Sequence, residues 1–281
     1  MAKTVFWVKN STDFSLDTSW KTSTARATTV PVSTDTIRWA EGSDEVQTGL
    51  SQSAVDTAEF WIKPGCSPRI GANGTPLEIS CTGAFIYEAD EGFVFLKAGS
   101  ANIASLRCFS PRGQLYLVGG VIDGRIDVGS FLRITGDQSL SGNTLAVYKG
   151  AEVLVQYKAD GTDPVFTQNG GFCRLERPTL TASITGGECV MAVEREAVAC
   201  PAVTVKGDAK LTVLRGTITN LDAKEATGTI VLDGLVTITD SQFGPDVTVI
   251  RHKATVFTNT PTLYGNRSDA AGGPTWQFNG G

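Results

Sequence analysis

The sequence has few of the residue types that most catalytic and metal sites need. It contains one histidine, and none of its six cysteines belongs to a Cys-x-x-Cys pair. One histidine excludes a Cys₂His₂ zinc site, and a Ser-His-Asp triad could use only His252, which lies between two cations. We expect His252 to be a surface residue. We predict no metal site, no cofactor and no enzymatic activity.

Long apolar runs and clusters of basic residues are also missing. No apolar run reaches the roughly 18 residues of a membrane-spanning helix, and residues 1–10 lack the apolar core of a signal peptide. The net charge is −5 and the lysines and arginines are scattered. We therefore predict binding to neither membranes nor nucleic acid. The cysteines fall in strand-like runs, which predicts buried, reduced thiols in a cytoplasm rather than disulfides.

Paired carboxylates would be needed for polysaccharide hydrolysis. The candidate pairs are Asp123 with Asp127, Glu194 with Glu196, and Asp222 with Glu225. Asp123 precedes a glycine and reads as a turn residue. Glu194 and Glu196 flank an arginine, as expected on the solvated face of a strand. We interpret all three pairs as surface features without a catalytic role.

One short sequence motif recurs along the chain: a run of β-branched residues that ends in glycine and is followed by another such run. Residues 211–216 (LTVLRG) lead into 217–220, and residues 229–234 (TIVLDG) lead into 235–239. Earlier versions occur at 115–119, 131–136 and 145–150. Strands and turns that repeat at this spacing are typical of a β-solenoid. We predict an all-β fold, a right-handed parallel β-helix with strands of three to five residues. A β-sandwich or jelly roll is the alternative.

Strand-like runs recur along the chain from residue 60 to about residue 257. They are residues 60–63, 77–80, 84–88, 93–97, 103–109, 115–118, 131–134, 145–148, 153–157, 190–193, 203–206, 211–214, 229–232 and 247–250. We divide the chain into an N-terminal cap and contact segment (1–48), a β-helix (49–257) and a C-terminal arm (258–281). The first segment holds three of the five tryptophans, and the last is a polar, glycine-rich stretch that ends in aromatic residues. This last segment either folds back over the last turn of the coil or reaches a neighbouring subunit.

The aromatic residues of the two end segments are the predicted contact residues, because aromatic side chains dominate interface energetics. At the N-terminal end they are Phe6, Trp7 and Trp20, and at the C-terminal end they are Tyr264, Trp276 and Phe278. An equally simple interpretation is that the early tryptophans plug the end of the coil.

Several phrases resemble β-helical head decoration, or cement, proteins of tailed bacteriophages. They are the tryptophan-rich start, the turn from Val30-Pro31 to Ile37, and the segments at 49–53 (GLSQS), 70–77 (IGANGTPL) and 262–265 (TLYG). The resemblance spans most of the chain but rests on loose phrases rather than one invariant motif. It implies a capsid-bound, non-enzymatic structural protein of the virion and carries over no catalytic residues.

The resemblance further implies binding to the major capsid protein, commonly as a homotrimer. We therefore expect a location on the capsid surface after assembly in the bacterial host cytoplasm. Several weak contacts per oligomer would stabilise the shell through avidity. The alternative is a phage tail spike, a receptor-binding protein that acts on host surface polysaccharide, which would make a host glycan the partner.

Overall fold

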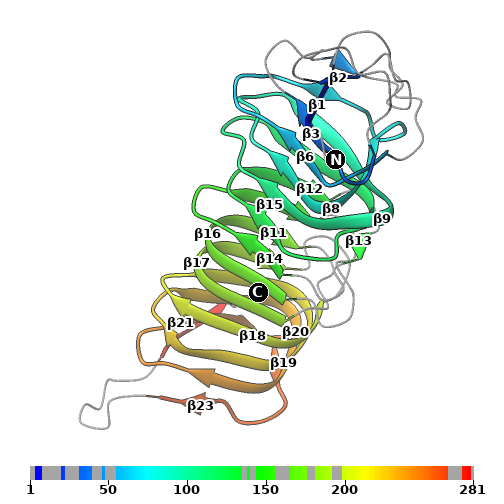
Figure 1. The fold of residues 1–281 in the computed structure, drawn as a ribbon. Helices are drawn as coiled ribbons and strands as arrows, with labels where there is room; N and C mark the ends of the chain where they lie inside the picture. Colours follow the sequence, from blue (N-terminus) through cyan, green and yellow to red (C-terminus); the bar gives the residue numbers. More distant parts are fainter. Residues whose placement is uncertain are drawn as a thin grey trace. The chain divides into compact units, whose positions relative to one another are not determined.

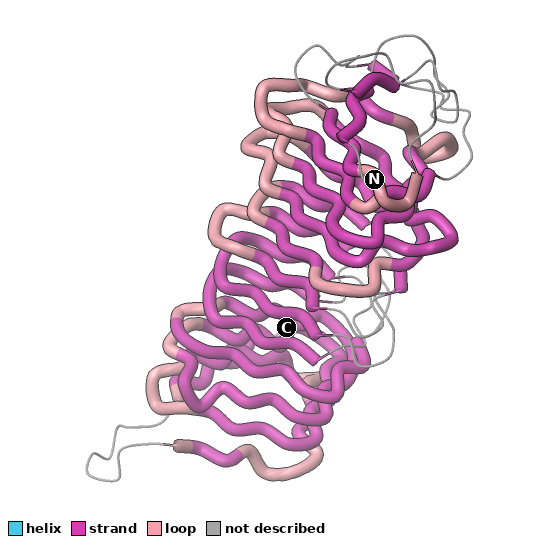
Figure 2. The backbone as a smooth tube through the Cα atoms, in the orientation of Figure 1, coloured by secondary structure: helices cyan, strands magenta, loops and turns pink. Residues whose placement is uncertain are grey.

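The chain forms strands and turns, with no helix among the residues that the structure describes (Figure 2). The structure is a computed structural model, and it describes residues 4–7, 20–22, 32–39, 46–47, 55–134, 138–139, 144–155, 165–175, 181–191, 198–264 and 274–279. The chain divides into two compact units, residues 1–143 (unit 1) and residues 144–281 (unit 2).

Unit 1 contains strands β1 to β13, stacked one turn on the next (Figure 1). Their bounds are β1 Thr4–Trp7, β2 Trp20–Thr22, β3 Thr36–Trp39, β4 Val46–Gln47, β5 Val55–Thr57, β6 Glu59–Ile62, β7 Arg69–Ile70, β8 Leu77–Tyr87, β9 Phe93–Cys108, β10 Gln114–Val121, β11 Ile126–Val128, β12 Phe131–Ile134 and β13 Gln138–Ser139. β1 and β2 pair in antiparallel. The other strand pairs described in unit 1 are parallel.

Unit 2 contains strands β14 to β24. Their bounds are β14 Thr144–Val147, β15 Glu152–Val155, β16 Val165–Leu175, β17 Thr181–Met191, β18 Val198–Gly207, β19 Lys210–Ala226, β20 Thr229–Phe243, β21 Thr248–His252, β22 Val256–Phe257, β23 Thr262–Leu263 and β24 Thr275–Asn279. The strand pairs described in unit 2 are parallel. The predicted parallel β-helix is therefore confirmed, and the sandwich alternative is wrong because sandwich sheets are antiparallel. The right-handed sense of the coil stays a prediction.

Several strands are much longer than the predicted three to five residues. β19 has 17 residues and β20 has 15. Their ladder shifts register between Val213 and Arg215 and then continues past Gly216. Gly216 and Gly234 have φ angles of 125° and 127°, which side chains disfavour. A Cβ on Gly234 would lie 2.5 Å from the Leu214 carbonyl oxygen. Each glycine thus bends the chain at a corner while the ladder runs on.

The interior consists of columns of apolar side chains, one residue from each turn. In unit 2, Leu211, Ile230 and Val249 are in register and are each 0% exposed. In unit 1, Phe60 and Phe85 are in register and stack with their ring centroids 5.3 Å apart. The alternating apolar residues of the repeated motif fill these columns, because successive side chains of a strand point to opposite faces.

The six cysteines are buried and none forms a disulfide. Cys173 of β16 is in register with Cys189 of β17, so these two thiols occupy one interior column. Burial raises the pKa of the Cys81 thiol and of the Cys108 thiol to about 12. The predicted interior packing of the cysteines is confirmed. The predicted reducing cytoplasm stays a prediction.

Buried hydroxyl groups tie neighbouring turns together at corners. Thr57 Oγ1 donates to the Asp35 carbonyl oxygen at 2.5 Å, and Ser110 Oγ donates to that of Ala89 at 2.5 Å. Thr255 Oγ1 donates in the same way to the Leu232 carbonyl oxygen at 3.2 Å. Each acceptor lies one turn earlier in the chain, so these hydroxyl groups satisfy backbone carbonyls where the chain bends.

The parallel ladder extends into both end segments proposed from the sequence. β3, inside residues 1–48, lies parallel to β6, and its Trp39 is 0% exposed. β24, inside residues 258–281, lies parallel to β21. Parallel pairing thus occurs on both sides of residues 48 and 257, and the division of the chain and the contact roles of the two end segments stay predictions.

Candidate functional site

Five of the six predicted contact residues lie on strands β1, β2 and β24, and the sixth, Tyr264, directly follows β23. Phe6 and Trp7 lie on β1 and Trp20 on β2, where Trp7 and Trp20 are opposite each other in register. Phe278 lies on β24, in register with Arg251. The side chains of these four aromatic residues lie outside what the structure describes. Tyr264 and Trp276 are described: Tyr264 follows β23, which lies on β20, and Trp276 is on β24, which lies on β21.

Among the described residues, the interior positions of unit 2 become exposed at β22 and β23. Ala223, Phe243 and Leu263 form one interior column, in register from β19 through β20 to β23. Ala223 and Phe243 are 0% exposed, whereas Leu263 is 52% exposed. A second column runs from Ile238, which is 0% exposed, to Phe257, which is half-buried. Positions that are sealed in earlier turns are thus open at the end of the described ladder.

Trp276 covers part of this opening. It is in register with Val249, so it occupies the next place in an interior column, yet it is only half-buried. Its ring meets those of Phe243 and Phe257 edge to face, at centroid distances of 5.4 and 6.0 Å. This geometry is the favourable one for aromatic pairs. It holds the indole at a fixed angle beside the uncovered strands.

Arg251 brings a charge into the same turn. Its column contains Val213 and Leu232, both buried, so the guanidinium stands where earlier turns have an aliphatic side chain. The guanidinium carbon lies 5.4 Å from the centroid of the Phe257 ring, and Nη2 donates to the Thr255 carbonyl oxygen at 3.3 Å. Sequence reasoning missed Arg251, because the run Arg251-His252-Lys253 looks like a charged surface. The signal that could have found it is its spacing of two residues from Val249.

These residues line a groove of about 620 Å³. It is bounded by Arg251, residues 255–261, Leu263 and Trp276. Its volume falls in the range of ligand-binding clefts. The walls combine two aromatic rings with a guanidinium and the side chains of Thr258, Asn259 and Thr260. The lining includes no aspartate or glutamate. Such a surface can bind an apolar group and offer hydrogen bonds at its rim, but it supplies no carboxylate for acid–base chemistry.

Tyr264 lies beside the groove rather than in it. It follows the lining residue Leu263 in the chain and is 43% exposed. Its hydroxyl donates to Gln242 Oε1 at 3.2 Å, and Lys224 Nζ lies 5.9 Å from the ring centroid. Val256 and Leu263 are also exposed, at 53% and 52%, so this end of unit 2 presents several exposed apolar side chains. The structure thus brings two of the predicted contact residues, Tyr264 and Trp276, to one end of unit 2.

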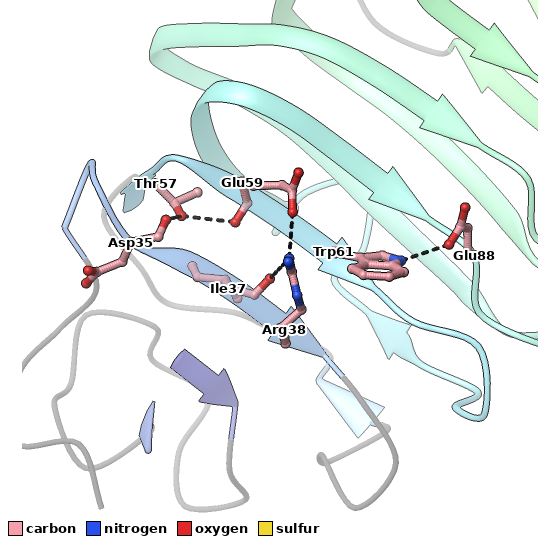
Figure 3. Close-up of polar contacts among 7 residues, drawn as sticks. All are labelled: Asp35, Ile37, Arg38, Thr57, Glu59, Trp61 and Glu88. Atoms are coloured by element: carbon pink, nitrogen blue, oxygen red, sulfur yellow. Dashed lines mark hydrogen bonds and ion pairs between the residues drawn. The ribbon is translucent and has the colours of Figure 1, made fainter. Parts of the chain in front are cut away.

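A different tryptophan, Trp61, lies on the outer face of unit 1 and is surrounded by partners (Figure 3). Its Nε1 donates to Glu88 Oε2 at 2.9 Å. Arg38 and Lys63 lie over its ring at 4.7 and 5.2 Å. Arg38 Nη1 also pairs with Glu59 Oε1 at 2.7 Å (Figure 3). Strand β3, strand β6 with the residue after it, and the segment after β8 supply these groups, so the cluster is a clasp between neighbouring turns.

The aromatic rings on the outer face of β9, β10 and β12 pack against one another. Phe95 and Tyr116 stack with centroids 4.6 Å apart and an interplanar angle of 10°. Phe93 packs edge-on against Phe95, and Phe131 lies 6.0 Å from Tyr116. The stacking covers one face of the Phe95 ring and one face of the Tyr116 ring.

The carboxylates considered from the sequence have basic or amide partners where they are described. Asp123 accepts hydrogen bonds from Asn102 Nδ2, and Asp127 accepts one from Arg125 Nε at 2.6 Å. Asp222 pairs with Lys224 at 3.3 Å, and Glu225 with Lys206 at 2.8 Å. Glu194 and Glu196 lie outside the described residues. None of the four described carboxylates lines the groove.

The described ranges contain no group of three or more His, Cys, Asp or Glu residues placed to hold a metal ion. They also contain no helix with the length and apolar character to cross a membrane. His252, the lone histidine, is half-buried, and its Nδ1 accepts a hydrogen bond from the Ala254 amide at 3.2 Å.

Comparison with protein-family models gave no match to this chain, and comparisons with curated proteins and with solved structures gave none either. The geometry of the groove and the ladder therefore carries the functional argument.

Proposed function

We propose that this chain is a non-catalytic structural protein that docks through the last turn of unit 2. The observation that carries the proposal is the uncovered interior column, in which Leu263 is 52% exposed after two residues at 0%. An open solenoid end exposes apolar stack and unpaired backbone, which a cap or a partner must cover. Trp276 and Phe257 beside it supply the aromatic anchors that dominate interface energetics.

Following the resemblance, the proposed partner is the major capsid protein of a tailed bacteriophage, and the protein decorates the capsid surface as a homotrimer. The stacked columns would make each unit a stiff body, because close-packed interiors resist deformation. Each trimer would bind the capsid through three such ends at once, so its avidity would exceed the affinity of any single contact. Deposition on the shell would follow assembly in the host cytoplasm.

The alternative, a tail spike that acts on host polysaccharide, makes a different demand on the groove. Glycoside hydrolysis needs two carboxyl groups that flank the scissile bond. The groove lining has none, and this favours the structural proposal.

Reconstitution tests the proposal directly. Expanded capsids that lack the protein are incubated with the purified chain and imaged by cryo-electron microscopy, and we expect ordered density on the shell. Density only at the tail would overturn the decoration proposal. Release of reducing sugar from host surface glycans would overturn the non-catalytic one.

A further inference from the structure

The last turn of unit 2 ends in an open hydrogen-bonding edge. β22 and β23 each pair with β20, and no strand within the described ranges pairs with their other side. The Thr258 amide donates to the Ile238 carbonyl oxygen, and the Tyr264 amide to that of Phe243, both at 2.8 Å. Successive residues of a strand direct their N–H and C=O groups to opposite neighbours. The backbone groups of Phe257 and Leu263 therefore face away from β20.

The groove lies along this edge. Val256, Phe257 and Leu263 line it from β22 and β23, and Trp276 lines it from β24. β24 lies on β21 and so begins a further turn. Within the described ranges no further strand lies over β22 and β23, and the groove runs there. The groove thus combines outward-facing backbone N–H and C=O groups of β22 and β23 with the apolar side chains of Phe257, Leu263 and Trp276.

We propose that an extended polypeptide segment of the partner adds here as a parallel strand, paired with Phe257 and Leu263. Strand addition to an exposed sheet edge takes affinity from main-chain hydrogen bonds and specificity from alternate side chains. The parallel direction follows from the pairing of every described strand in unit 2. The identity of the partner as a capsid subunit rests on the function proposed above, whereas the mode of binding does not.

The columns define which segment fits. In β20, the residues that stand over these positions are Ile238 and Phe243, five places apart. A fitting segment therefore carries two apolar residues at about this separation. The first would contact Phe257 and Trp276, and the second would cover Leu263. Glycine or another small residue between them would allow the corner.

A peptide that copies Leu235–Gly244 of this chain is the probe, because it carries the two apolar residues at the right spacing. In the parallel register, the N–H of Thr239 in the peptide donates to the Phe257 carbonyl oxygen, whereas the N–H of Ile238 points away. N-methylation at Thr239 should weaken binding about tenfold relative to N-methylation at Ile238. The two methylated peptides have the same composition, so equal affinities would overturn strand addition.

Amide hydrogen exchange gives a second readout on the whole protein. Bound peptide should slow exchange at the Phe257 and Leu263 amides and leave Thr258 and Tyr264, already bonded to β20, unchanged. The same measurement on capsid-bound protein separates the two proposals. Binding to capsids without protection of Phe257 and Leu263 would overturn strand addition and leave the decoration proposal intact. Peptide binding with this protection but no capsid binding would overturn the capsid partner alone. Protection that rises with protein concentration in the absence of peptide would overturn a foreign partner in favour of a second copy.

Discussion

Trp61 in unit 1 and Trp276 in unit 2 are both half-buried, and they occupy opposite kinds of surroundings. Trp61 is held by Glu88, Arg38 and Lys63 on the outer face of a continuing ladder. Trp276 stands in an interior column where the described ladder ends, with rings on one side and a groove on the other. An aromatic side chain whose partners come from neighbouring turns stabilises the coil. One with an open side is placed to recognise something else.

We expect the largest effect on stability from substituting one buried phenylalanine in each unit, Phe85 in unit 1 and Phe243 in unit 2. Phe85 and Phe243 are both 0% exposed, and Phe243 supports the Trp276 ring. Phe85→Ala and Phe243→Ala should each lower the free energy of unfolding by about 3–5 kcal/mol, through lost burial and a cavity. Urea titration measures this change. Only Phe243→Ala should also weaken binding to capsids, and an equal loss of binding in both variants would contradict the contrast.

Truncation of the two tryptophans comes next in size. Trp276→Ala should weaken capsid binding by about 2 kcal/mol or more, roughly 30-fold, as expected of an aromatic anchor. Trp61→Ala is the matched control, since it removes a half-buried indole outside the groove. Sedimentation of the protein with capsids measures affinity, and thermal unfolding confirms that both variants are folded. A Trp61→Ala variant that binds as weakly as Trp276→Ala would place the contact surface on the outer face of unit 1.

The parallel ladder could be predicted from the sequence, but the position of its corners could not. β-branched runs closed by glycine, as at 211–216 and 229–234, are typical of strands that stack turn upon turn. The same pattern predicts that each strand ends at its glycine. In the structure the ladder of β19 and β20 shifts register between Val213 and Arg215 and then resumes, with Gly216 opposite Val236, so the strands continue through the corner.

The groove could not be predicted from the sequence, because its position also depends on how neighbouring turns are paired. Trp276 and Tyr264 were identified as aromatic residues in an unusual tail, and the structure places both at the end of unit 2. Arg251 and Leu263 were missed because their roles depend on register, which pairs Arg251 with Leu232 and Leu263 with Phe243. Which interior positions are left uncovered depends on where the stacking stops, and no local pattern marks that turn.

Because the thiols inside unit 1 are buried, the free energy of unfolding should depend on pH in the alkaline range. Burial raises the pKa of Cys81 and of Cys108 from 9.0 to about 12. Between these pH values the unfolded chain loses the thiol protons that the folded chain keeps. The free energy of unfolding should therefore fall as pH rises from 9 to 12, by about 1.4 kcal/mol per pH unit for each thiol.

Urea titrations at several pH values from 8 to 11 measure this slope. Cys108→Ala should be less stable at pH 8 and should show a shallower decline above pH 9, since one raised pKa is gone. Other groups that titrate in this range contribute equally to both proteins, so the difference in slope isolates the thiol. Parallel lines for the two proteins would show that solvent reaches Cys108, and the interior of unit 1 would then not be sealed.

The smallest effect belongs to the clasp around Trp61. Arg38 and Glu59 are 20% and 33% exposed at the side chain, so water screens their ion pair. Glu59→Gln keeps the shape and removes the charge, and it should cost only about 0.5 kcal/mol of unfolding free energy. The loss should shrink in 1 M salt, where screening is stronger. A loss above about 2 kcal/mol, unchanged by salt, would exceed what a partly exposed pair supplies. It would mean that the outer clasp, rather than the interior columns, holds the first turns of unit 1 together.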